Sequence, residues 1–199
     1  MSAPRQPART PRTPRAAQIV AAARDLLEEC GRDHLTMRAL AERIGIRAPS
    51  LYKHFRNKEA VEAALVEDRL AEMGAALHAA LRQASGPDRV PVLLDAYRRH
   101  ARAHPALYRL LTAGPLPREA LPDGLEEWAG TPFFLATEDS YLAQALWSYA
   151  HGMVVLELDG RYPEGSELDR TWEAGARAFA AQATTGLDLR DGSRVRAAP

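Results

Sequence analysis

Basic and aromatic side chains are concentrated in one stretch near the N-terminus, TMRALAERIGIRAPSLYKHFRNKEA, which runs from Thr36 to Ala60. It holds six Arg or Lys residues together with Tyr52 and His54. Arginine and lysine neutralise phosphates, and the planar arginine fork can also bond to the O6 and N7 atoms of one guanine. The residue types therefore favour binding to a polyanion, and their spacing decides which of them can reach it.

Two short helices joined by a turn account for that spacing. Thr36 can cap the first helix through its hydroxyl, and Gly45 ends it. The second helix is predicted over 48–55, with Leu51 and Phe55 turned inward because they are four residues apart. Such a pair is a helix-turn-helix, whose second helix lies in the DNA major groove while the first crosses the backbone. An ordinary three-helix packing unit with a solvated basic face is the alternative.

The outer face of the predicted second helix carries small and polar side chains. Those that can face bases are Ala48, Pro49, Ser50 and Lys53. Tyr52 and His54 are placed to donate hydrogen bonds to phosphates on either side. Lys58 stands at the start of the next helix, where free backbone N–H groups and the helix dipole favour an anion.

The charge of the chain is divided between its two ends, although the net charge is zero. Residues 1–58 hold 12 Arg or Lys against 5 Asp or Glu, whereas the remaining residues hold 14 against 21. A basic head and an acidic body indicate two surfaces with different partners, and the basic one suits a polyanion. An accidental segregation of surface charge is the alternative.

Residues 35–65, LTMRALAERIGIRAPSLYKHFRNKEAVEAAL, closely resemble the DNA-binding domain of the tetracycline-repressor (TetR) family. The resemblance implies an all-α protein of about nine helices, in which a long helix joins the helix-turn-helix domain to a C-terminal domain. It also implies a homodimer that binds a palindromic operator and releases it when a small molecule fills the C-terminal domain. Repression is the default in this family, although activators exist.

The same resemblance implies roles for individual residues. Phosphate contacts are implied for Thr36, Tyr52, His54 and Lys58. Base contacts are implied for residues 48–50, Lys53 and Arg38. Arg38 carries the most physical weight among these, because its fork can bond to one guanine twice. Arg47 is a further candidate, or else a solvated turn residue.

The chain divides into four predicted segments. Residues 1–14, with four Pro and three Arg, form a disordered basic tail that either adds attraction to DNA or is only solvated. Residues 15–60 form the helix-turn-helix domain, 61–185 the ligand-binding and dimerisation domain, and 186–199 a flexible tail. The alternation of a β-strand is missing throughout, so only helices are predicted.

A second, looser resemblance covers residues 147–179, WSYAHGMVVLELDGRYPEGSELDRTWEAGARAF. They look like the Trp-His-Gly C-terminal domain found in a subset of these regulators, with Trp147, His151 and Gly152 as the matching residues. The region between the two resemblances, roughly 86–136, matches only in its helical tendency. We expect ligand preference to be set there.

The two predicted closing helices, 138–159 and 167–184, carry apolar stripes. A pair of such helices from each of two subunits can form a four-helix dimer interface, which the family resemblance also implies. The candidate interface residues are Leu142, Tyr149, Met153, Leu168, Trp172, Gly175 and Phe179. The alternative is that these stripes belong to the core of one subunit. A palindrome needs two reading helices, which favours the dimer.

A ligand pocket needs an apolar lining with a few polar groups. The aromatic and imidazole candidates are Tyr97, His100, His104, Tyr108, Trp128, Phe133, Phe134, Tyr141, Trp147 and His151. His151 follows Trp147 by four residues, so both point the same way, as a ligand contact or as a core residue. His100 and His104 have a spacing that can bind a metal, but nothing on that helix completes the ligand set, so no metal is expected.

Several other classes of protein are disfavoured by the sequence. It has no GxSxG, phosphate-loop or GxGxxG signature, so neither an enzyme nor a cofactor is expected. The single cysteine excludes an internal disulfide framework, and no apolar run reaches the length that spans a bilayer. We therefore expect a soluble cytoplasmic protein without a membrane partner. A DNA-packaging protein without ligand control is the remaining alternative.

Overall fold

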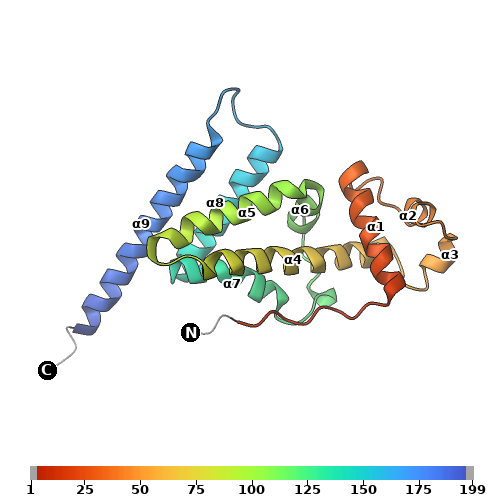
Figure 1. The fold of residues 1–199 in the computed structure, drawn as a ribbon, viewed down its shortest axis with the longest axis horizontal. Coiled ribbons are helices and arrows are strands. Elements are labelled where there is room, and N and C mark those ends of the chain that lie inside the picture. The colour runs from red at the N-terminus through yellow and green to blue at the C-terminus, as the bar shows by residue number, and fades with distance from the viewer. Residues whose placement is uncertain (1–3, 196–199) are drawn as a thin grey trace. The chain divides into compact units, whose positions relative to one another are not determined.

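The computed structural model describes the backbone of residues 4–195 and the side chains of residues 4–184. Over this range the chain is all helical, as predicted, and no strand occurs in it (Figure 1). The α-helices are α1 (Pro14–Cys30), α2 (Met37–Arg43), α3 (Ala48–Leu51), α4 (Lys58–Arg82), α5 (Arg89–Ala103), α6 (Pro105–Thr112), α7 (Leu125–Thr137), α8 (Ser140–Leu158) and α9 (Leu168–Val195). In this part of the chain no helix is long and apolar enough to cross a membrane.

The helices pack as two units. Within the described residues, the N-terminal unit comprises 4–72 and 103–126, and the C-terminal unit comprises 73–102 and 127–195. The division falls inside α4, whereas the predicted domain boundary followed residue 60. It also groups α6 with the helix-turn-helix, which the sequence did not suggest, because α6 buries Leu107 and Leu110 in the same core as α1 and α4.

The starts of the N-terminal helices follow their capping residues. The Thr13 hydroxyl accepts a hydrogen bond from Ala16 N–H at 3.2 Å, directly before Pro14 opens α1. Thr36 caps α2 in the same way, and the Asn57 side chain accepts from Ala60 N–H at 3.0 Å to cap α4. Each cap pairs a backbone donor that the helix leaves unbonded. The starts of α2 and α4 were predicted correctly, because such caps depend only on neighbours in sequence.

One helix differs from the sequence expectation. The α3 helix ends at Leu51 rather than Phe55, because His54 N–H bonds to the Leu51 carbonyl at 2.9 Å and tightens the chain into a turn. The α7 helix lies mostly in the region where the sequence indicated only a helical tendency, and it contains Pro132. A proline inside a helix normally ends or kinks it.

A histidine from α4 compensates for Pro132. The missing N–H of Pro132 would have bonded to the carbonyl of Trp128, four residues earlier. That carbonyl instead accepts a hydrogen bond from His78 Nε2 at 3.0 Å, so Nε2 carries the proton. The His78 ring also stacks on the Trp128 ring, with their centroids 4.8 Å apart. Gly74 leaves room for the Trp128 ring, because a Cβ at Gly74 would lie 2.5 Å from Trp128 Cζ3. In the C-terminal unit α4 and α7 are thus locked together.

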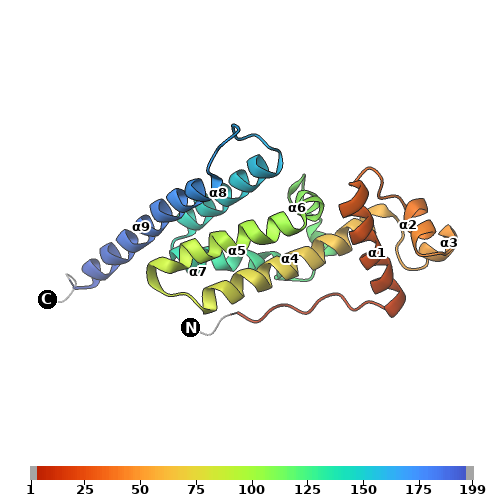
Figure 2. The same cartoon turned by 45° about the horizontal axis from the view of Figure 1, so that its top comes forward.

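In the same unit the first part of α9 lies beside α8 (Figures 1 and 2). Arg98 of α5 joins them through Glu157 of α8, at 2.9 and 2.8 Å, and Asp169 of α9, at 2.6 Å. The indole N–H of Trp172 donates to the same Glu157 carboxylate at 3.1 Å. The charge-assisted bonds to Glu157 are partly shielded from water, whereas Asp169 is exposed, and together they hold α5, α8 and α9 to one another.

The structure describes parts of both predicted tails. Residues 4–13 have no regular structure, but Arg9 and Arg12 are held by carboxylates of α4 and are not free. At the other end, α9 continues to Val195 where a flexible tail was predicted from residue 186. The last four residues of that predicted tail, 196–199, lie outside the described residues.

The pairing of His78 with Pro132 predicts a specific rescue. Replacing His78 by Leu leaves the Trp128 carbonyl buried without this donor, which we expect to lower the free energy of unfolding by about 1–3 kcal/mol. Adding Pro132→Ala restores the helical N–H to that carbonyl, so His78→Leu should cost clearly less in the Pro132→Ala background. Urea unfolding of the four proteins measures the coupling. An equal cost in both backgrounds would contradict this explanation.

Candidate nucleic-acid interface

The turn between α2 and α3 depends on Gly45. Its φ of 65° lies in the left-handed region, which favours glycine because other residues pay for their Cβ there. This conformation lets Ile46 N–H bond to the Ala41 carbonyl at 3.0 Å and Gly45 N–H bond to the Glu42 carbonyl at 3.2 Å. The last carbonyls of α2 are thereby satisfied, and the chain is turned sharply into α3.

The inward face of α3 is anchored in the core of the N-terminal unit. Leu51 is fully buried among α1, α2 and α4, together with Ile19, Leu40 and Leu65. Phe55 is partly buried and packs against the same core. This confirms the prediction that Leu51 and Phe55 turn inward.

Most of the predicted DNA-contacting side chains are brought together on the opposite, exposed face. The exposed members are Thr36, Arg38, Arg47, Pro49, Ser50, Tyr52, Lys53 and His54. Ala48 and Lys58 are partly buried. Thr36 keeps a hydroxyl proton to donate, because its oxygen acts only as the acceptor of the α2 cap. Their contacts with DNA stay predictions, since exposure shows only that DNA can reach them.

Arg38 is held by its neighbour one turn later. Its Nε donates to Glu42 at 2.9 Å, and this hydrogen bond, with the charge of Glu42, raises the pKa of the guanidinium. The side chain is 88% exposed. The bond occupies Nε alone, so the two terminal nitrogens of the fork remain available for a pair of acceptors such as O6 and N7 of guanine.

Lys58 has an internal role that the sequence did not reveal. Its ammonium donates to the Arg32 carbonyl at 2.9 Å and lies 3.6 Å from Glu62. Arg32 itself holds Glu62 with two bonds of 2.9 Å. Burial raises the pKa of Glu62, but the bonds and charge of Arg32 outweigh it, so that the pKa is lowered. A phosphate would have to share Lys58 with this cluster.

Another ion pair fixes α2 to α1. Arg43 reaches Glu29 with a bond of 2.7 Å, and the bond lowers the pKa of Glu29. Arg32, Glu62, Glu29 and Arg43 were absent from the sequence-based site, because partners 14 and 30 residues apart leave no local pattern. Of these four, Arg32 and Glu62 contact one predicted DNA-contacting residue, Lys58, and the two ion pairs hold the elements that carry the exposed face.

The predicted ligand candidates are scattered over different environments. In the C-terminal unit Tyr97, Trp128 and Phe133 are buried, and Tyr97 meets Phe133 edge to face at 5.7 Å. Phe134, Tyr141 and Trp147 are exposed, Tyr141 at 82%. His100 is partly buried there, whereas His104 and the fully buried Tyr108 belong to the N-terminal unit. Eight of the ten thus belong to the C-terminal unit and two to the N-terminal unit, and their role as a ligand lining stays a prediction.

Trp147 and His151 do lie together, as their spacing predicted. Their rings stack with centroids 6.2 Å apart, and burial lowers the pKa of His151. The stack suits a packing role, and a ligand contact of His151 stays a prediction. A cleft of about 400 Å³ lies elsewhere, in the N-terminal unit, and none of the ten candidates lines it.

The predicted dimer residues pack largely inside one subunit. Tyr149 meets Trp172 at 5.9 Å and Phe179 at 5.4 Å, and a Cβ at Gly175 would overlap the Tyr149 ring. Met153 and Trp172 are buried, and Leu142 and Leu168 are partly buried. For these residues the structure favours the alternative, in which the apolar stripes of the two closing helices belong to the core of one subunit. The absence of a side chain at Gly175 lets the Tyr149 ring pack between α8 and α9.

Sequence comparison extends the resemblance over most of the chain. Residues 19–65 match the model of the bacterial regulatory proteins of the tetR family, and residues 90–179 match that of the tetracyclin repressor-like C-terminal domain. An uncharacterised HTH-type transcriptional regulator of Mycobacterium tuberculosis is 32% identical over 159 residues, which cover 71% of this chain and 69% of that protein. The narrower Trp-His-Gly assignment stays a prediction.

Two tetracycline repressors are also similar. The class A repressor from transposon 1721 of Escherichia coli is 57% identical over 54 residues, 27% of this chain and only 25% of the repressor's length. A TetR variant from Acinetobacter baumannii AYE, solved in complex with minocycline, is 26% identical with a TM-score of 0.60, covering 83% of this chain and 93% of that one. With its helix-turn-helix and these matches, the chain is a member of the TetR family of bacterial transcriptional regulators.

Proposed function

We propose that this regulator is a ligand-responsive repressor that binds a palindromic operator as a homodimer and is released by a small, largely apolar effector. The observation that carries the proposal is the exposed face of α2 and α3, which presents Arg38, Ser50 and Lys53 to solvent. The opposite side of α3, the reading helix, is fixed in the core. A face of this kind presents donors to base edges and phosphates at once. Such a role belongs in the cytoplasm.

A homodimer supplies the second reading helix that a palindrome requires. The outer face of α8 suits the interface better than the stripe predicted from sequence. Tyr141 is 82% exposed and Leu156 is 42% exposed, and between them a Cβ at Gly152 would meet open space. Small residues flanked by large apolar ones let a second helix approach closely. We therefore place the dimer contact on this face.

An effector acts only if it binds the free and the DNA-bound conformations unequally. The related Acinetobacter structure holds minocycline, which supports a small-molecule effector for this chain as well. In the present chain the Trp128 carbonyl is bonded to His78 of α4 and the Trp128 ring packs against Gly74 of α4, so a ligand that displaces Trp128 would also disturb α4. Such a ligand would alter the spacing of the two reading helices.

A DNA-binding protein without ligand control is the second candidate. It would form the same complex with DNA but would not be displaced by any small molecule. Titration of candidate apolar compounds against a preformed operator complex separates the two. Dissociation at a fixed, saturable compound concentration supports the gated regulator, and its absence across a broad library favours the ungated protein.

Arg38 should read one base pair in each half-site. If its fork holds a guanine, Arg38→Ala should weaken operator binding by about 1–3 kcal/mol and remove discrimination at that position alone. Arg38→Lys should recover only part, because an ammonium lacks the planar fork. A competition assay with each operator position substituted in turn, at fixed salt, measures this. An equal loss on operator and random DNA would instead make Arg38 a phosphate anchor.

The salt dependence of binding should distinguish Lys53 from Lys58. A lysine on a phosphate contributes about 0.9 to the slope of log affinity against log salt concentration. We expect Lys53→Ala to weaken DNA binding or to reduce this salt slope, while the melting temperature of the protein stays unaltered. Lys58→Ala should also lower the melting temperature, because it releases the Arg32 carbonyl and Glu62. A Lys58→Ala protein with unchanged slope and lower stability would have lost only a structural contact.

Two glycines test where the dimer forms. Gly152→Arg projects into open space and replaces a helical glycine, so the subunit should fold while the dimer dissociates. Gly175→Arg should unfold the protein, because Tyr149 occupies that space within the subunit. Light scattering should give twice the 21.8 kDa chain mass for the wild type and one chain mass for Gly152→Arg. An intact Gly152→Arg dimer would move the interface elsewhere.

A further inference from the structure

Two adjacent carboxylates on α4 are unusually well shielded from water. Glu67 is 2% exposed and Asp68 is 7% exposed. Removing a carboxylate from water costs several kcal/mol unless cations and hydrogen bonds replace its hydration. Adjacent carboxylates repel one another as well, so this segment of α4 requires positive charge from another part of the chain.

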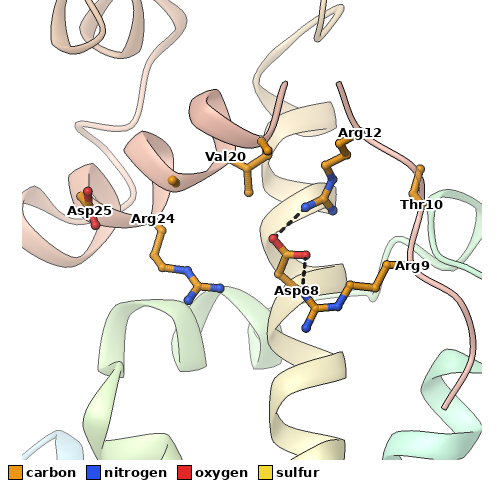
Figure 3. A pocket seen from close by; sticks show the side chains of 9 residues that line it. Arg9, Thr10, Arg12, Val20, Arg24, Asp25 and Asp68 are labelled. Atoms are coloured by element: carbon orange, nitrogen blue, oxygen red, sulfur yellow. Dashed lines mark hydrogen bonds and ion pairs between the residues drawn. The ribbon is translucent and has the colours of Figure 1, made fainter. Parts of the chain in front are cut away.

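The basic N-terminal arm supplies that charge (Figure 3). The guanidinium of Arg12 reaches Asp68 at 2.7 Å and Glu67 at 2.9 Å, and it also donates to the Ala64 carbonyl at 3.1 Å. Its side chain is only 15% exposed. These three bonds use both terminal nitrogens of Arg12, so Arg12 is the main contact that anchors the arm to α4.

Two further contacts fix the arm in its register. The backbone N–H of Thr10 donates to Glu67 at 2.6 Å, and Arg9 lies 3.4 Å from Asp68 with a side chain that is 45% exposed. The arm then leads without a gap into Thr13, the cap of α1. Because the anchor lies directly before the cap, docking of the arm holds the start of α1 against α4.

We propose that residues 9–12 are a strap that binds the Glu67–Asp68 pair and fastens α1 to α4, and that they do not reach for DNA. The charges of Arg9 and Arg12 are matched by the two carboxylates, so they add little to the attraction of phosphates. The pair on α4 is therefore a docking site for an extended, arginine-bearing segment, and its occupant is the chain's own N-terminal arm. The strap stands independently of the effector and the operator.

Limited proteolysis tests docking directly. Trypsin can cut after Arg5, which is exposed, and after Arg12, which the strap protects. In the wild type, cutting after Arg12 should be slower than cutting after Arg5 by on the order of ten-fold or more, because it requires local release of the arm. In the Glu67→Gln, Asp68→Asn protein, checked for folding by circular dichroism, the two rates should approach each other. Equal rates in the wild type would overturn the proposal.

A matched pair of variants separates a strap from a DNA-binding arm. Arg9→Ala, Arg12→Ala should lower the melting temperature by on the order of 5 °C, because it strips a shielded acidic pair of its cations. Arg5→Ala, the control on the same arm, should leave it unchanged. The salt slope of DNA binding should change little in either protein. A slope reduced by about 0.9 for each lost arginine, with an unchanged melting temperature, would make the segment a DNA arm instead.

Discussion

The orientation of α3 depends on its burial and not on its own helical stability. A helix of four residues, Ala48–Leu51, is far too short to persist alone, because nucleation of a helix is unfavourable and the turns that repay it are missing. Leu51 in the core and the glycine turn at Gly45 therefore define where the reading face points. The ion pairs between Arg43 and Glu29, and between Arg32 and Glu62, hold the neighbouring helices to which α3 is fastened.

Those ion pairs change the meaning of the charge asymmetry. Many arginines of the basic head are paired with carboxylates inside the N-terminal unit, among them Arg12, Arg24 and Arg32. Their charge stabilises the scaffold and is largely cancelled there. The cations that remain exposed on the α2–α3 face, such as Arg47 and Lys53, are the ones that meet the DNA in our proposal. Net charge by segment indicated the correct half of the molecule, but it overestimated how much of that charge can act on a phosphate.

Features that depend on neighbours in sequence, such as helix caps, were predicted well. Features that depend on contacts between distant residues were predicted less well. Thr13, Thr36 and Asn57 cap helices by bonding to residues three positions away, and the predicted starts at Thr36 and Lys58 were correct. The sequence alone did not reveal that α7 continues through Pro132, because proline by itself breaks helices and the compensating donor, His78, lies 50 residues from Trp128. In the site, the predicted exposed face was recovered, whereas the supporting role of Lys58 and the internal packing of Tyr149 on Gly175 required the tertiary structure.

Selection of DNA fragments by the purified protein from a random pool tests the central claim most directly. A homodimer with one reading helix in each subunit predicts that the selected sequences converge on an inverted repeat, with half-site centres about one helical turn, roughly 10 base pairs, apart. That spacing would follow from two copies of α3 entering successive major grooves on one side of the duplex. Convergence on a single unrepeated site, or no convergence at all, would contradict a dimeric reader of palindromes.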